Sequence, residues 1–370
     1  MSTIRSFIRK EPVLIIAALA ALSSCLLVPP DREYFSYIDL RTLSLLYCLM
    51  VVISGLRQAG LFSRMAHSFC RKAASTRSIG LVLVLLCFFS SMLITNDVAL
   101  LTFVPFSMLI LSETDRKTDL IHIIVLQTVA ANLGSMLTPV GNPQNLYLYS
   151  FYNLSVREFL LTMFPFYALS LIVISGACFL LSDEPVRFHL GEAPEMRTGS
   201  LWFYAGLFVI CLLAVVRLLS WPWMLALVVC FLLFFNRRLL TDADFMLLLT
   251  FVAFFIFAGN LARVEVLADG IRQLLTGREY LTALLASQII SNVPAALLIA
   301  DFTNQIHPLL LGINIGGLGT PVASLASLIS MKLYTRSDHA RSGRYLLEFT
   351  VVNVFLLLFL SVPVLSFGAR

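Results

Sequence analysis

The chain has 370 residues, of which 59% are hydrophobic and only 13% are charged, and its net charge is +5. Soluble domains are about 45–50% apolar and about 25% charged, and even large ones bury only about three quarters of the surface that the unfolded chain exposes. The composition therefore excludes a soluble enzyme, a nucleic-acid-binding protein and a disordered chain. It predicts a membrane protein whose surroundings are the lipid bilayer.

Apolar stretches that are candidate membrane-spanning helices recur along the chain. They occupy 12–29, 42–56, 119–150, 159–182, 201–219, 221–236, 243–260, 306–334 and 346–367. The basic start (Arg5, Arg9 and Lys10) followed by an apolar run is typical of a signal peptide. Because many spans follow, we expect this first helix to be retained.

Two further apolar stretches, 79–111 and 279–304, are interrupted near their middle by polar residues. Thr95, Asn96 and Asp97 interrupt the first, and Ser291 and Asn292 interrupt the second. Backbone that breaks a helix inside a membrane is tolerated only where protein or a water-filled cavity covers it. Both stretches are therefore predicted to be re-entrant helical hairpins that enter and leave on the same side.

The spans 119–150 and 306–334 are unusually long, and each contains its own break. They share the pattern N-x-G-x-x-x-T-P-V at residues 132–140 and 314–322. In both halves this pattern follows a polar hairpin tip, and the landmarks come in the same order, which indicates an internal repeat. We predict a first membrane repeat at 1–182, a loop and connecting span at 183–219, and a second repeat at 220–370.

The basic residues predict the orientation. With the N-terminus inside and each hairpin returning to its own side, most of the 26 Lys and Arg residues fall in inside segments, as the positive-inside rule requires. An odd number of crossings then separates the halves. The predicted fold is an all-α polytopic membrane protein with a cytoplasmic N-terminus and two inverted-topology repeats, each holding a hairpin and a broken helix.

Broken helices expose unpaired N–H groups at one end and C=O groups at the other, which attract anions and cations respectively. Hydroxyl and amide side chains are concentrated at the breaks. Their oxygens are hard ligands that suit Na⁺, and as neutral hydrogen-bonding groups they also suit a carboxylate or an oxyanion. The predicted substrate- and ion-binding residues are Thr95, Asn96, Asp97, Asn132, Thr138, Gly141, Asn142, Asn145, Ser291, Asn292, Asn314 and Thr320. Of these, Asn96, Asp97 and Asn292 are the candidate Na⁺ ligands.

Asp97 is the carboxylate at a predicted hairpin tip, and an ionisable group inside a membrane indicates function. The alternative is a helix N-cap or an ion pair with an arginine. His122 and His307 precede the two breaks and are expected at helix ends near the interface, with a proton relay as the alternative. Tyr147 and Tyr149 are expected to mark an interface.

Three segments resemble the citrate-transporter-like ion transporter superfamily, which includes divalent anion/sodium symporters, arsenite-pump membrane subunits and sodium/proton antiporters. They are Thr95–Pro105, Thr138–Asn145 and Ser291–Pro294. The resemblance implies inverted repeats, a homodimer and elevator-like alternating access. In the dicarboxylate branch of this superfamily, Ser-Asn-Thr motifs at both hairpin tips bind sodium and the carboxylate of the substrate. Here Asp97 and Val293 stand at the third position, and an acidic tip is similar to the arsenite and antiporter branches.

The leading functional hypothesis is a secondary active transporter of the bacterial inner membrane. It would move a small inorganic or organic anion, or an oxyanion, coupled to Na⁺ or H⁺ and without another cofactor. The alternative is a sodium/proton antiporter or an arsenite-type efflux permease. A membrane enzyme is disfavoured because the sequence contains no nucleophile–base motif or metal motif.

Overall fold

The computed structural model describes residues 11–71, 73, 75–112, 117–185, 195–337 and 340–367. The basic start at residues 1–10 and the loop segment 186–194 lie outside this range. Within it the fold is all-helical, apart from an isolated bridge between Ser75 and Pro185. Of the helices in these segments, six are long and apolar enough to cross a membrane, which confirms the predicted class of multi-pass helical membrane protein.

The helices follow the predicted spans with shifts of a few residues at their ends. In the first half they are α2 (Pro12–Ser24), α3 (Tyr34–Tyr37), α4 (Leu40–Gln58), α5 (Leu61–Cys70), α6 (Thr76–Ile94), α7 (Asn96–Ser112), α8 (Lys117–Ser135), α9 (Pro143–Phe151) and α10 (Val156–Cys178). The rest of the chain forms α11 (Thr198–Val215), α12 (Trp221–Phe235), η1 (Arg237–Thr241), α13 (Phe245–Arg263), α14 (Glu265–Leu275), α15 (Glu279–Ile290), α16 (Asn292–Ile299), η2 (Ala300–Phe302), α17 (Ile306–Ile315), η3 (Pro321–Ala323), α18 (Leu325–Thr335) and α19 (Ser342–Phe367).

Both predicted hairpins are interrupted where the polar residues stand. Thr95 separates α6 from α7 with φ 69° and ψ 151°, and Ser291 separates α15 from α16 with φ 75° and ψ 154°. This backbone region is used almost only by glycine, and a residue held there costs about 1–3 kcal/mol. The same costly geometry therefore recurs at the same place in both halves.

Both long spans are broken, as predicted. The first stops at Ser135 and restarts at Pro143, and the second stops at Ile315 and resumes as α18. Each break begins at a glycine that lies against the first helix of its hairpin. A Cβ on Gly134 would meet Phe88 and Ser91 of α6, and a Cβ on Gly316 would meet Leu284 and Ser287 of α15. Small residues of this kind let two helices approach closely in a membrane.

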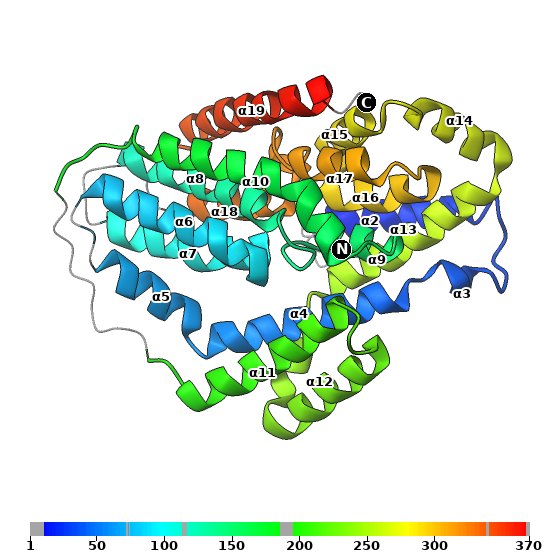
Figure 1. The fold of residues 1–370 in the computed structure, drawn as a ribbon, viewed down its shortest axis with the longest axis horizontal. Helices are drawn as coiled ribbons and strands as arrows, with labels where there is room; N and C mark the ends of the chain where they lie inside the picture. Colours follow the sequence, from blue (N-terminus) through cyan, green and yellow to red (C-terminus); the bar gives the residue numbers. More distant parts are fainter. Residues whose placement is uncertain are drawn as a thin grey trace, which may run out of the picture.

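The two hairpins lie toward opposite ends of the molecule. Figure 1 shows α5 and the hairpin α6–α7 toward the left, and α14 and the hairpin α15–α16 toward the right. The broken helices cross this division, because α8 and α18 lie toward the left whereas α9 and α17 lie toward the right. The two breaks therefore come together in the middle of the fold.

Two expectations from the aromatic residues are wrong. Tyr147 and Tyr149 do not mark an interface, because both are only 1% exposed. Tyr147 packs on Phe251 and Phe255 of α13, and the Tyr149 hydroxyl donates to the carbonyl of Val215. Both side chains serve as packing between α9 and its neighbours, because α9 runs through the protein interior.

Candidate functional site

A buried network of amides and hydroxyls joins the two breaks. The side-chain oxygen of Asn132 accepts from Asn96 Nδ2 at 3.0 Å and from Ser324 Oγ at 3.0 Å, and Asn132 Nδ2 donates to Ser327 Oγ at 3.3 Å. Asn132 lies on α8, Asn96 begins α7, and the two serines lie at the start of α18. One side chain thus ties the first break to its own hairpin tip and to the other half.

Asn314 makes the matching contacts from the second half. Its Nδ2 donates to Asn145 Oδ1 at 2.7 Å, and its Oδ1 accepts from Asn142 Nδ2 at 3.5 Å. In the repeat pattern Asn314 corresponds to Asn132, and Asn142 and Asn145 stand where Ser324 and Ser327 stand in the other half. Each asparagine therefore bonds to the residues that correspond to the other one's partners, as two copies related by a two-fold axis do.

The threonines of the shared pattern hold each hairpin against its break. Thr138 Oγ1 donates to the carbonyl of Met92, and Thr320 Oγ1 donates to the carbonyl of Gln288 at 3.1 Å. The tips add further ties: the Asn96 backbone N–H donates to the carbonyl of Gly141 at 3.2 Å. Thr138, Thr320 and Gly141 are thus structural parts of the breaks, and Thr320 is exposed.

The side-chain amides of Asn145 and Gln288 form hydrogen bonds with backbone groups that the breaks leave without helical partners. Asn145 Nδ2 lies 3.3–3.5 Å from the carbonyls of Ser135, Met136 and Thr138. Gln288 Nε2 donates to the carbonyls of Gly316 at 2.7 Å and Leu318 at 2.9 Å, and Gln288 Oε1 accepts from the N–H of Thr320 at 2.9 Å. Such pairing is needed because an unsatisfied backbone group in an apolar environment costs several kcal/mol.

Asp97 faces a cavity beside this network. The cavity has a volume of about 250 Å³ and lies between α4, the α7 tip, the start of α9, and the segment that leads into α13. Asp97 Oδ1 is buried and has no hydrogen-bond partner. Asp97 is the second residue of α7, and within the described segments it forms no ion pair. Neither structural alternative, a capping role or a salt bridge, therefore accounts for it.

The cavity also contains charges that sequence reasoning missed. Its polar lining consists of Ser54, Arg57, Thr95, Asp97, Asn142, Asp242 and Asp244, and apolar residues of α4, α7, α9 and α13 complete it. Arg57, Asp242 and Asp244 are not among the site residues predicted from the sequence. Nothing in the sequence places 242–244 beside residue 97, because the contact depends on how the halves pack.

Most but not all of the predicted site residues lie in the cavity lining or in the buried network. Thr95, Asp97 and Asn142 line the cavity, and Asn96, Asn132, Asn145 and Asn314 form the network. Of the three candidate Na⁺ ligands, Asp97 lines this cavity, whereas Asn96 and Asn292 do not. Ser291 Oγ lies 3.4 Å from the carbonyl of Ala323.

The histidines connect the halves in pairs. His122 Nδ1 of α8 lies 2.6 Å from Glu348 Oε1 of α19, and His307 Nε2 of α17 lies 3.7 Å from Glu158 Oε1 of α10. Each pair joins the start of a broken helix in one half to the start of the last helix of the other half. Neither histidine lines the Asp97 cavity.

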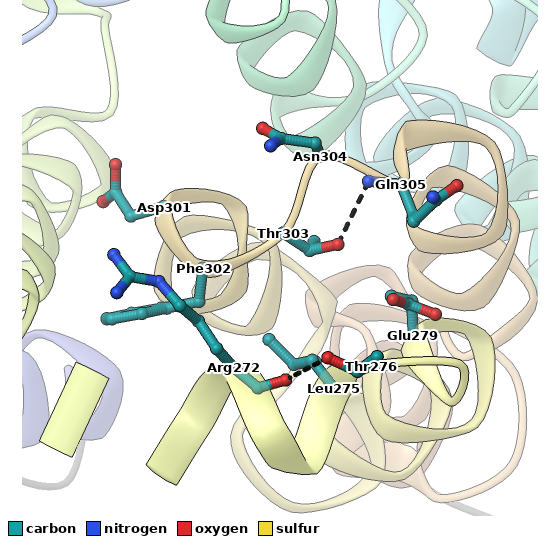
Figure 2. Close-up of a pocket in the computed structure, with 9 residues that line it drawn as sticks. All are labelled: Arg272, Leu275, Thr276, Glu279, Asp301, Phe302, Thr303, Asn304 and Gln305. Carbon is teal, nitrogen blue, oxygen red and sulfur yellow. Dashed lines mark hydrogen bonds between the residues drawn. The ribbon is translucent and has the colours of Figure 1, made fainter. Parts of the chain in front are cut away.

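A second cavity, of about 520 Å³, opens between α14 and the segment that follows α16. Figure 2 shows Arg272 and Glu279 at its wall with Asp301 at its edge. It contains none of the predicted site residues. Asp301 lines this cavity, and its side chain is exposed.

Comparison with known proteins supports a transport role. The citrate transporter family (CitMHS) matches residues 4–310. The chain is 33% identical over 333 residues to the uncharacterized transporter MJ0456 of Methanocaldococcus jannaschii, covering 89% of this chain and 90% of that protein. It is 29% identical over 309 residues to the inner membrane protein YbiR of Escherichia coli K12, covering 82% of each.

A shorter similarity, 30% over 138 residues, links 37% of the chain to 28% of the silicon efflux transporter LSI3 of Oryza sativa subsp. japonica. The family match covers more than half of the chain. The protein is a multi-pass membrane transporter and belongs to the citrate transporter family.

Proposed function

We propose that this protein is a secondary active transporter that moves a small anion or oxyanion, coupled to H⁺ or Na⁺ at Asp97. The observation that carries the proposal is the Asp97 carboxylate, which lines a cavity and has one buried oxygen without a hydrogen-bond partner. A carboxylate held in an apolar environment without a partner binds a proton or a cation readily. The amides and hydroxyls beside it can bind the oxygens of a polar solute.

The charged residues around the cavity can couple binding of the transported anion to binding of H⁺ or Na⁺. Three carboxylates (Asp97, Asp242 and Asp244) and one guanidinium (Arg57) line it. An anion entering this space alone would be repelled, because like charges interact strongly where water is scarce. Binding of a proton or Na⁺ by Asp97 lowers that repulsion, so the anion binds well only after the coupling ion. Ordered binding of this kind is the basis of symport.

We further propose that the halves are inverted repeats that move by an elevator-like mechanism, with repeats at 1–182 and 220–370 joined by 183–219. The reciprocal contacts of Asn132 and Asn314 and the opposite placement of α5 and α14 in Figure 1 support this arrangement. The positive-inside pattern favours a cytoplasmic N-terminus. The similarity to an Escherichia coli inner membrane protein supports the inner membrane, and we propose a homodimer there.

The test is transport by the purified protein in liposomes. Uptake of radiolabelled citrate, phosphate and arsenite is measured with an imposed pH gradient, an imposed Na⁺ gradient, or neither. We expect one gradient to drive accumulation of at least one solute, and Asp97→Asn to abolish the accumulation. Asp269→Asn is the control, because Asp269 lies on exposed α14 and pairs with Arg272. The proposal fails if no gradient drives uptake, or if Asp97→Asn accumulates solute like the wild type.

A second candidate is an efflux permease or a sodium/proton antiporter. The excess of carboxylates over arginine in the cavity favours it, because such a cavity attracts cations and accepts a neutral acid. The partial similarity to a silicon efflux transporter agrees with a neutral oxyacid as cargo. Proton release from liposomes on addition of Na⁺ without any other solute would favour the antiporter. Export of silicic acid driven by a proton gradient would favour the efflux permease.

A further inference from the structure

Arg57 is a cation at the mouth of the Asp97 cavity. It is the penultimate residue of α4, and its exposed side chain lines the cavity together with Ser54, which lies one turn earlier on the same helix. Within the described part of the chain Arg57 forms no ion pair and no hydrogen bond through its side chain. Its five N–H donors are therefore available to a ligand in the cavity.

The acidic neighbours of Arg57 already have other partners. Gln58 Nε2 donates to Asp242 Oδ2 at 2.8 Å, and Asp244 Oδ1 accepts from the N–H of Leu247 as the N-cap of α13. Both carboxylates have a position set by these bonds, and neither lies within ion-pair distance of Arg57. The guanidinium is thus kept beside the cavity without being neutralised by direct contact.

The start of α9 also lines the cavity and suits the same kind of ligand. Asn142, which caps the N–H of Asn145, and Pro143 lie there, at the positive end of the helix dipole. The Arg57 guanidinium and the N-terminus of α9 provide two separate sources of positive potential in the lining of the cavity. Asp97 lines the same cavity and supplies the negative charge for the coupling ion.

We propose that Arg57 is the docking and specificity-determining residue for a carboxylate or phosphate-type oxyanion at this mouth of the transporter. The inference rests on the function proposed above and adds to it the chemical class of the cargo and the side from which Arg57 acts. Arg57 belongs to α4, at the end of the fold where α5 begins (Figure 1). This placement predicts that substrate arriving from the other face of the membrane reaches the centre without passing Arg57.

The competing explanation is structural. A basic residue in the last turn of a helix stabilises the helix through its dipole. Removal of Arg57 would then lower thermal stability slightly and leave the concentration dependence of transport unchanged. The two explanations differ in KM, in the kind of solute affected, and in the face of the membrane at which the effect is seen.

The experiment compares wild type, Arg57→Gln, Arg57→Lys and the control Arg64→Gln in right-side-out and inverted membrane vesicles. Arg64 lies on α5, close in sequence to Arg57, and does not line the cavity. The probes are radiolabelled citrate, inorganic phosphate and neutral silicic acid. For an oxyanion that the wild type carries, we expect Arg57→Gln to raise KM about tenfold or more from the Arg57 face, because hydrogen bonds to charged groups contribute about 1.5–3 kcal/mol.

KM from the opposite face should change little, and Arg57→Lys should fall in between, because lysine keeps the charge without the planar fork. Silicic acid transport and the Arg64→Gln variant should be unaffected. Equal KM values for wild type and Arg57→Gln, or equal effects at both faces, would overturn the role of Arg57 and leave the transport function standing. A wild type that carries silicic acid but neither oxyanion would overturn it too. A wild type that carries neither these probes nor arsenite under any gradient would refute the proposed function itself.

Discussion

Substitution of Gly134 by alanine tests the close approach that positions the first break. An ideal Cβ at this position would lie 2.0 Å from the backbone carbonyl oxygen of Phe88 and 2.7 Å from Ser91 Oγ. The nearest atom belongs to the backbone of α6, so a side-chain rotation cannot relieve the overlap. The two helices must separate, and this moves Asn132 away from the hairpin tip that holds Asn96.

The expected cost follows from that overlap. Inserting a methylene into a well-packed core costs about 1–3 kcal/mol, and more where backbone must move, so we expect Gly134→Ala to destabilise the protein by about 2–4 kcal/mol. The matched control is Gly176→Ala on α10, where nothing lies within 4 Å of an added Cβ. There the change should be neutral or stabilise by about 0.5–1 kcal/mol, since alanine loses less backbone entropy in a helix.

The assay uses the free cysteines of the chain as reporters. Most of them are buried, so a thiol-reactive fluorophore labels them only as the protein unfolds on heating; the buried ones are Cys48, Cys70, Cys87, Cys178 and Cys211. We expect the Tm of Gly134→Ala to fall by several degrees while the Tm of Gly176→Ala stays at or above that of the wild type. If both variants melt together with the wild type, the close α6–α8 approach is not a requirement of the fold.

Three further outcomes follow from the described contacts. Gln288→Met should destabilise by about 2–4 kcal/mol, because three backbone groups of the second break lose their partner, and a Tm equal to that of the wild type would contradict the clamping role. Asn132→Ala and Asn314→Ala should each slow transport, and the double variant should cost less than the sum of the two in Tm; strict additivity would show that the network is not shared between the halves. Hydrogen bonding to the Arg263 guanidinium lowers the pKa of Asp31, in the loop between α2 and α3. Its contribution to stability is present above the ordinary aspartate value and is lost as the pH falls below about 4, so Asp31→Asn should flatten the decline of Tm from about pH 5 to about pH 3; parallel declines would refute this.

The membrane class, the spans, both hairpins and both breaks could be predicted from the sequence. Each is a local property: an apolar run long enough to span, or polar residues and prolines that interrupt one. The order of landmarks in the two halves also predicted which residues correspond. Asn132 and Asn314 were matched by a constant offset, and the structure places both in one network with corresponding partners.

The composition of the cavity depended on the tertiary structure. Arg57 and Asp242 occupy segments that are basic or acidic for topological reasons as well, so their local sequence does not distinguish a loop charge from a cavity wall. The burial of Tyr147 and Tyr149 was missed for a related reason, because aromatic residues near a break are as typical of an interface as of a core. Gln288 was missed because its partners lie 28 to 32 residues away.

In a chain that is 59% hydrophobic, the few charged residues are thus informative in two ways, through their positions in the sequence and through their positions in the fold. By itself the sequence determined that the protein lies in lipid, where its helices break, and that Asp97 stands at a break, because these follow from the length and polarity of local segments. Only the tertiary structure decided that Asp97 shares a cavity with an arginine and two further carboxylates, both of which accept hydrogen bonds. Those groups come from three separate segments, and their meeting is set by how α4, α7 and α13 pack, which no local pattern encodes.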